Sequence, residues 1–303
     1  MKNGLLGIEQ LDRAEIEAIL DRARAFQPGP NEPFRRLDVL RGRMVVNLFF
    51  EASTRTRTSF EIAAKRLGAD TISITASGSS VSKGESLVDT LNTLGAMRPD
   101  AIVMRHAASG APHFLARYLP TPIINAGDGT HEHPTQALLD ARTILDRRPT
   151  LENLRVAIIG DIAHSRVARS NMHLLSKFGA TIVLCGPASL LPPELEKLAT
   201  GVILTNDIRD AIREADVIMM LRVQLERQHE SAFPAGEYFQ FFGLRLEHLD
   251  LAKPDAIVMH PGPINRGREI SSDVADSQRS MILNQVGNGV AVRMAVLERV
   301  LQN

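Results

Sequence analysis

Short apolar runs recur along the chain, and segments with helical spacing of apolar positions separate them. Strands are predicted where the apolar runs occur, in RMVVNLFFE, DTISIT, DAIVMRH, TPIINAG, RVAIIGD, TIVLCGP, DVIMMLR and DAIVMHP. Amphipathic helices are predicted between them, in segments such as LDRAEIEAILDRARAF, ESLVDTLNTLGAM, PTQALLDARTILDRR and SRVARSNMHLLSKFG. Strands that are apolar throughout and alternate with helices indicate parallel sheets with helices on both faces.

The chain has 303 residues, which is enough for two domains of ordinary size. A helix that begins near Pro134 leads from the first group of strands to a second group that opens with LRVAIIG. We therefore predict an α/β protein with two doubly wound parallel-sheet domains and the active site between them. The first domain is expected to span residues 1–133 together with a C-terminal helix at about 285–303, and the second to span residues 134–284.

Composition narrows the class of protein. The 35 basic and 35 acidic residues cancel, which argues against a nucleic-acid binder, because such proteins usually carry a basic excess. No apolar run reaches the ~18–20 residues that span a bilayer, and the N-terminal segment lacks the apolar stretch of a signal peptide. The single cysteine, Cys185, cannot form an internal disulfide and is typical of a reducing compartment. We expect a cytoplasmic protein with no membrane or nucleic-acid partner.

The segment STRTRTS, residues 53–59, lies between a predicted strand and the start of a predicted helix. Ligands of parallel sheets bind beyond the carboxyl ends of strands, and the first turn of a helix offers unpaired N–H groups to an anion. Helix capping alone would explain one hydroxyl, but not a row of hydroxyls and guanidinium groups. The segment lacks the glycines and lysine of a Walker loop. It predicts a phosphate-like anion site.

Three more arginines lie close to strand ends or helix starts: Arg105 after DAIVM, Arg166 in GDIAHSR and Arg222 after DVIMML. A charge at the end of a buried strand is costly unless it is paired or binds an anion. Arg105 could equally form a salt bridge with an acidic neighbour, and Arg166 could be an exposed helix arginine. A guanidinium at position 222 can hold a carboxylate with two hydrogen bonds.

Two other patterns in the sequence could indicate a metal or cofactor site. His131 and His133 flank Glu132, but this is not the H-E-x-x-H motif, and no acidic or cysteine cluster beside it completes a zinc site. Gly160 is the one glycine where a dinucleotide fold would need three. We expect no metal and no organic cofactor. A metal-dependent hydrolase built on HEHP remains an alternative that chelators would test.

The stretch F-x-E-x-S-T-R-T-R-T-S-F resembles the carbamoyl-phosphate motif of the aspartate and ornithine carbamoyltransferase family. Further segments resemble that family in the same order: SSVSKGESLVDT, VMRH, HEHPTQALLD, GDIAHSRVARS, MLRVQLER and MHPGPINRG. The resemblance covers nearly the whole chain, and it implies a carbamoyl-phosphate-binding first domain and an aspartate-binding second domain.

The resemblance also implies roles for individual residues. Carbamoyl phosphate would be bound by Ser53, Thr54, Arg55, Thr56, Arg105, His133 and Gln136. Aspartate would be bound by Lys83, Arg166, Arg222, Gln224, Gly262 and Pro263. The catalytic set would be Arg55, Thr56, Lys83, Arg105 and His133.

The implied reaction is carbamoyl transfer from carbamoyl phosphate to the α-amine of L-aspartate, in de novo pyrimidine (UMP) biosynthesis. The alternative is transfer to ornithine or a related amine, but Arg222 suits a second carboxylate and would repel an ammonium group. The ornithine enzymes also carry a cysteine where this chain has HPGP. A catalytically silent homologue acting as a scaffold is a further alternative, against which the complete set of charged residues counts.

The matching lysine of the family enters the active site of the neighbouring subunit, so the resemblance implies a homotrimer with shared sites. Taken alone, Lys83 in its Ser/Gly loop would be an ordinary solvated lysine. Association with regulatory chains or with a dihydroorotase stays open. Residues 228–244 form a long segment without regular pattern, which is either a lid that closes over aspartate or an ordinary surface loop.

Overall fold

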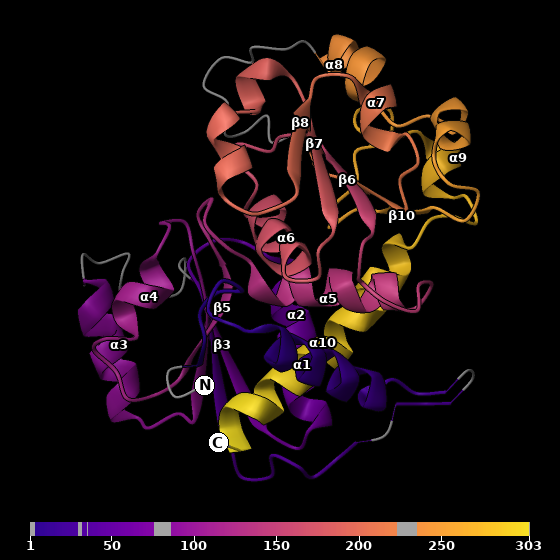
Figure 1. Cartoon of the computed structure of the whole chain (residues 1–303). Coiled ribbons are helices and arrows are strands. Elements are labelled where there is room, and N and C mark those ends of the chain that lie inside the picture. The colour runs from indigo at the N-terminus through magenta and orange to yellow at the C-terminus, as the bar shows by residue number, and fades with distance from the viewer. Residues whose placement is uncertain (1–3, 30–31, 35, 76–85, 223–234, 303) are drawn as a thin grey trace. The chain divides into compact units, whose positions relative to one another are not determined.

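The computed structural model describes residues 4–29, 32–34, 36–75, 86–222 and 235–302. The chain divides into two compact units, the first made of Met1–Arg142 and Gly287–Asn303 and the second of Thr143–Val286. Each unit is built on a five-stranded sheet in which every strand pairing is parallel (Figure 1). The predicted class of two parallel-sheet α/β domains is confirmed. Among the described residues, no helix is both long and apolar enough to cross a membrane.

The sheet of the first unit has the strand order β1-β5-β4-β2-β3. Its strands are β1 (Gly4–Leu5), β2 (Met44–Phe49), β3 (Asp70–Thr75), β4 (Ala101–His106) and β5 (Ile123–Asp128). Its helices are α1 (Arg13–Phe26), α2 (Thr54–Arg66), α3 (Leu87–Ala96), α4 (Ala111–Leu115) and most of α5 (Pro134–Leu145) and α10 (Ile282–Gln302). After β2 the chain forms β3 on one side of β2, and it later forms β4 on the other side. The strand order therefore reverses between β2 and β4.

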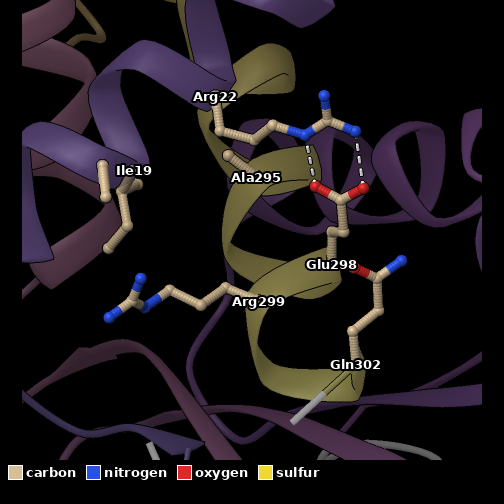
Figure 2. Close-up of a pocket in the computed structure, with 7 residues that line it drawn as sticks. Ile19, Arg22, Ala295, Glu298, Arg299 and Gln302 are labelled. Carbon is tan, nitrogen blue, oxygen red and sulfur yellow. Dashed lines mark hydrogen bonds and ion pairs between the residues drawn. The ribbon is translucent and has the colours of Figure 1, made fainter.

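The two terminal helices of the first unit are joined by ion pairs. The Asp12–Glu15 capping box starts α1, and Arg22 on this helix donates two hydrogen bonds to the Glu298 carboxylate of α10, at 2.5 and 2.6 Å. Arg299 donates to Glu15 at 3.0 Å. Arg22, Glu298 and Arg299 also line a cavity of about 240 Å³ between the two helices (Figure 2). The last helix is thereby fixed to the first unit, although it follows the second unit in the sequence.

The sheet of the second unit has the strand order β10-β9-β6-β7-β8. Its strands are β6 (Arg155–Ile159), β7 (Thr181–Cys185), β8 (Val202–Thr205), β9 (Val217–Met220) and β10 (Ile257–Met259). Its helices are α6 (Arg166–Ser176), α7 (Ile208–Ile212), α8 (Ala235–Phe242) and α9 (Ser272–Ala275), with short 3₁₀ helices at Ala188–Leu190, Pro193–Lys197 and Leu246–Leu251. The order reverses between β6 and β9, as it does between β2 and β4 in the first unit.

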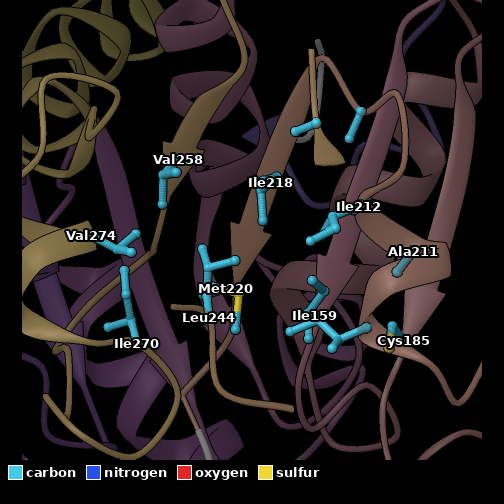
Figure 3. Close-up of a cluster of buried hydrophobic side chains, with 14 of the residues drawn as sticks. Ile159, Cys185, Ala211, Ile212, Ile218, Met220, Leu244, Val258, Ile270 and Val274 are labelled. Atoms are coloured by element: carbon cyan, nitrogen blue, oxygen red, sulfur yellow. The ribbon is translucent and has the colours of Figure 1, made fainter. Parts of the chain in front are cut away.

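One apolar cluster packs the sheet of the second unit against α7, α8 and the segments around residues 244 and 270 (Figure 3). Tyr238 and Phe242 of α8 belong to it, with exposed fractions of 2% and 5%. The prediction that residues 228–244 lack regular structure is therefore wrong for their last part, because α8 occupies Ala235–Phe242 and is held by its buried face. Residues 228–234 lie outside the described part of the chain.

The loop after β5 is organised by the buried carboxylate of Asp128. It accepts hydrogen bonds from Gly110 N–H at 2.6 Å, Asn125 Nδ2 at 2.8 Å and Glu132 N–H at 3.1 Å, and it pairs with His131 Nδ1 at 3.0 Å. These donors occupy the lone pairs of the carboxylate.

His113 and His131 each bring a nitrogen within 4.8 Å of the Asp128 carboxylate and of each other, a spacing that could hold a metal ion. We interpret the cluster as an anchor of the loop, because a cation would have to displace the hydrogen-bond donors of Asp128.

The Asp128–His131 pair should make stability depend on pH. The hydrogen bond to Asp128 raises the pKa of His131 above its ordinary value, although burial lowers it. Burial alone would raise the pKa of Asp128, but hydrogen bonds from His131, Asn125 and Gly110 outweigh it and bring this pKa below its ordinary value. His131 therefore contributes stability that is complete below its unfolded pKa of 6.5 and is lost as the pH rises through its raised folded pKa.

We expect the wild type to lose stability relative to His131→Gln as the pH rises from about 6 to about 9. Urea denaturation of both proteins across this range measures the difference. Two stability curves that stay parallel at every pH would contradict this account of the pair.

Candidate active site

The hydroxyl-rich segment lies at the point where the strand order of the first sheet reverses. Ligands of open parallel sheets bind at such points, beyond the carboxyl ends of the strands. Helix α2 begins at Thr54 with Ser53 as its N-cap residue, but the Ser53 hydroxyl makes no capping hydrogen bond. Thr54 and Arg55 are exposed, while Thr56 is buried. Capping therefore does not account for Ser53, and the first turn of α2 presents polar groups that can receive an anion.

Arg105 ends the neighbouring strand at the same edge. It is the register partner of Phe49, so it lies directly beside the end of β2. Its guanidinium donates to Glu51 Oε1 at 2.6 Å and to the carbonyl of Ala126 at 3.4 Å. The salt bridge that the sequence left open is thus present. Since the side chain is 11% exposed, Glu51 compensates a charge that would otherwise be costly to bury.

His133 lies in the loop after β5, the next strand along, and Gln136 lies in the first turn of α5. Both are almost fully buried, with exposed fractions of 4% and 8%, and Gln136 donates to Asp140 on the next turn of α5 at 2.9 Å. The neighbouring Glu132 turns away, because its carboxylate accepts the backbone N–H of Ile8 at 2.9 and 3.0 Å. Glu132 and its neighbour His131 therefore contact different groups, because His131 pairs with Asp128.

The sequence analysis did not identify Arg293, a buried cation of the first unit. Arg293 of α10 is 4% exposed and donates to Ser59 Oγ of α2 at 2.9 Å and to the carbonyl of Gly289 at 3.0 Å. Burial lowers its pKa to about 10; Asp140 opposes this lowering and Arg105 adds to it. The charges of Arg293 and Arg105 are therefore close enough to repel each other. The only signal was an arginine in the apolar run GVAVRMAV.

In the second unit, Arg166 and Arg222 follow the two strands that flank the reversal of strand order. Ser165 caps α6 by accepting the N–H of Ala168, which fixes Arg166 in the first position of that helix, where it is 8% exposed. Arg222 comes two residues after β9, and Leu221 N–H still bonds to the carbonyl of Ile159 at 2.8 Å. Two cations are thus placed at the ends of adjacent strands.

Gly160 explains how these two strand ends can approach each other. Its φ is +144°, and a Cβ at this position would lie 2.8 Å from the Cβ of Leu221. A glycine is needed here for close packing beside the Arg222 segment, whereas the sequence analysis considered it only as a remnant of a dinucleotide motif.

Gly262 and Pro263 lie in the loop after β10, the strand beside β9. The loop starts at His260, and Gly262 donates its N–H to His260 Nδ1 at 2.8 Å. Gly262 has a φ of +68°, in the left-handed region, and its peptide bond to Pro263 is cis. The candidate residues of each unit therefore come from the carboxyl ends of three adjacent strands: β5, β4 and β2 in the first unit, and β10, β9 and β6 in the second.

Lys83 and Gln224, two of the predicted aspartate ligands, lie outside the described residues. The remaining candidates fall into two groups, one in each unit. The group of the first unit combines a helix N-terminus, hydroxyls and guanidinium groups, which suits a phosphate. In the second unit the charged members are two arginines, and these suit carboxylates.

Comparison with known proteins agrees with this division. Residues 3–146 match the family model described as the carbamoyl-P binding domain of aspartate/ornithine carbamoyltransferase, and residues 152–300 match its Asp/Orn binding domain. The chain is similar to the aspartate carbamoyltransferase catalytic subunit of Solibacter usitatus, with 83% identity over 99% of this chain and 100% of that protein.

Solved structures of two kinds resemble the chain. Aspartate transcarbamoylase of Trypanosoma cruzi, solved with carbamoyl aspartate and phosphate, is 34% identical, with a TM-score of 0.90 over 99% of this chain and 96% of that one. Ornithine carbamoyltransferase of Pyrococcus furiosus is 30% identical, with a TM-score of 0.87 over 98% and 96% of the two chains. Both kinds of enzyme therefore share the fold. The chain belongs to the aspartate/ornithine carbamoyltransferase family.

Proposed function

We propose that this chain is an aspartate carbamoyltransferase: it transfers the carbamoyl group of carbamoyl phosphate to the α-amine of L-aspartate, giving N-carbamoyl-L-aspartate and phosphate. The observation that carries the choice of substrate is the pair Arg166 and Arg222: Arg166 begins α6, the helix after β6, and Arg222 lies just beyond the adjacent strand β9. Two guanidinium groups suit an acceptor with two carboxylates. The 83% identity to a catalytic subunit of this enzyme supports the same reading. The reaction belongs to de novo pyrimidine biosynthesis, and a cytoplasmic location is proposed with it.

Carbamoyl phosphate is assigned to the first unit. Its phosphate binds at the first turn of α2, with Arg55 as the charged fork and the hydroxyls of Ser53, Thr54 and Thr56 as further donors. Arg105 contributes from the end of β4. Glu51 pairs with this guanidinium, and the dianion adds a second negative partner for its charge.

The carbamoyl group itself is assigned to Thr56, Arg105, His133 and Gln136 of the first unit and to the loop after β10. Thr56, Arg105 and His133 surround the carbonyl oxygen and stabilise the negative charge that develops on it during attack. Gln136 contacts the carbamoyl amide, and carbonyl oxygens around Gly262 orient its N–H groups.

The chemical step needs position more than it needs a base. The neutral α-amine of aspartate, held by Arg166, Arg222, Gln224 and Lys83, attacks the carbamoyl carbon. The departing phosphate takes the amine proton, because no carboxylate among the candidate residues is assigned as a base. Both reactants are anions that repel each other in water. Holding them in register can supply ~7–11 kcal/mol of the barrier reduction in favourable cases, and no metal or organic cofactor is required.

Arg55→Ala should abolish turnover while leaving the fold intact, because the phosphate loses its charged fork at the α2 start. Steady-state kinetics and binding of inorganic phosphate measure the two effects. Arg57→Ala is the matched control: it lies on the same helix and pairs with Glu61 at 3.7 Å. Undiminished activity of Arg55→Ala would refute the phosphate site.

The assignment of aspartate predicts a clear substrate preference. Wild-type protein should carbamoylate aspartate and not ornithine, because Arg222 repels an ammonium group. Arg222→Ala should lower kcat/KM for aspartate about 10- to 150-fold, which corresponds to the ~1.5–3 kcal/mol of a charged hydrogen bond. The KM for carbamoyl phosphate should change little.

Arg155→Ala serves as the control for Arg222→Ala. Arg155 begins β6, so it lies at the amino ends of the strands of the same sheet, and it donates to the carbonyl of Arg213. A preference of the wild type for ornithine would overturn the assignment and leave the ornithine reaction as the function.

The proposal includes a homotrimer in which Lys83 acts in the site of the neighbouring subunit. Lys83→Ala and Arg55→Ala proteins should each be inactive alone. Mixed trimers, formed by dissociating and reassembling the two together, should regain activity, because one of their sites combines an intact Arg55 with an intact Lys83. If mixing restores nothing although mixed trimers form, the lysine does not cross between subunits.

A further inference from the structure

A buried carboxylate controls the loop that follows β10. Glu269 is 0% exposed, and its Oε1 accepts hydrogen bonds from the backbone N–H of Asn265 at 2.5 Å and from His260 Nε2 at 3.2 Å. Asn265 Nδ2 lies 3.4 Å from the other carboxylate oxygen. His260 and Asn265 are the two ends of the loop 260–265. One side chain therefore joins both ends.

The contact between Glu269 and His260 continues to the middle of the loop. His260 Nδ1 accepts the N–H of Gly262 at 2.8 Å. Because a backbone N–H can only donate, the ring proton of a neutral His260 is on Nε2, where it is donated to Glu269. The chain Glu269–His260–Gly262 thus has a fixed direction, and it fixes the tautomer of the ring as well as the position of the Gly262 peptide.

Apart from this chain of contacts, the start of the loop is held by the backbone N–H of His260, which donates to Gln285 Oε1 at 2.9 Å. Pro261 and Pro263 have no backbone N–H, and the N–H of Gly262 is already given to His260. Glu269 itself is held by contacts of its backbone and of the next residue. The carbonyl of Glu269 accepts the N–H of Leu244 at 3.0 Å, and the next residue, Ile270, is packed in the core of the unit (Figure 3).

The network lies next to residues that the proposed function uses. We propose that Glu269 is a positioning residue for carbamoyl transfer: acting through His260 and Asn265, it holds the carbonyl oxygens around Gly262 where they orient the carbamoyl amide. This inference rests on the proposed function. Glu269 touches no substrate; its effect is on the geometry of the loop, and a misplacement of about 1 Å can cost about a hundredfold in rate.

Two variants break the chain at different bonds. Glu269→Ala removes the acceptor of both His260 and Asn265. His260→Gln keeps a donor toward Glu269 but has no counterpart of Nδ1 to accept from Gly262. Each should lower kcat about 10- to 100-fold. Inorganic phosphate should inhibit both variants as it inhibits the wild type, because its binding site is assigned to the first unit. Glu269→Gln keeps an acceptor oxygen in place and should restore most of the lost kcat.

The combined variant tests whether the two residues act as one unit. Glu269→Ala with His260→Gln should be no slower than the slower single variant, since both remove the same restraint on Gly262. If the rate losses of the two single variants multiply in the combined variant, the chain of contacts from Glu269 through His260 to Gly262 is contradicted.

A structural role alone is separated from positioning by a matched control. Asp216 is another buried carboxylate of this unit, with an exposed fraction of 4%. It accepts the N–H of Arg155 at 2.9 Å, at the amino ends of the strands. Asp216→Ala should lower the Tm without changing kcat per folded molecule. If Glu269→Ala behaves in the same way, with lower Tm and unchanged kcat, the positioning role is wrong. If the wild type does not carbamoylate aspartate, it is the proposed function that fails.

Discussion

Positive charge gathered beyond the carboxyl ends of buried strands is the constraint on which the rest of this structure depends. Guanidinium groups at such places repel each other and lose their hydration, and a buried charge without compensation costs several kcal/mol. The first unit shows the consequence directly: burial and the proximity of Arg105 lower the pKa of Arg293. Glu51 is bonded to Arg105 at 2.6 Å and offsets part of this cost. The first unit is thus built around charges that an anion can compensate.

The parallel sheets provide the means of placing these charges. Each sheet reverses its strand order once at its centre, between β2 and β4 in one unit and between β6 and β9 in the other. The strands β2, β4, β6 and β9, which lead to the candidate residues, are largely buried, and this burial fixes the positions at which the segments after them begin. The same arrangement, used twice, places hydroxyls and guanidinium groups that suit a phosphate in one unit and guanidinium groups that suit carboxylates in the other. A chain with no net charge can in this way maintain strong local fields.

The sequence predicted those parts of the fold that have a local pattern. Strands such as β2 and β4 are recognisable because six mainly apolar residues in a row leave few other readings. Strands β1 and β8 were missed, and their parallel pairing with β5 and β7 is what makes them strands. Helix α8 was missed because its neighbouring residues lack periodicity, and the apolar cluster around Tyr238 is what orders it.

The candidate site follows the same division. STRTRTS could be recognised because its composition is unusual over several consecutive residues. Arg293 could not be recognised, because it is a single polar residue whose partner Ser59 is distant in the sequence. The pair His260 and Glu269 could not be recognised either, because Glu269 belongs to no motif. Their meaning arises only when α10 packs on α2, or when the loop after β10 folds back on itself.

The most direct test of the account is the affinity of the intact protein for one molecule that joins a phosphonate to a dicarboxylate. Titration calorimetry would compare it with the phosphonate and the dicarboxylate measured separately, at low and high salt. If converging cations force two mutually repulsive reactants together, the joined molecule should bind far more tightly than either part, and salt should weaken it. Binding no tighter than that of the phosphonate alone would contradict the account.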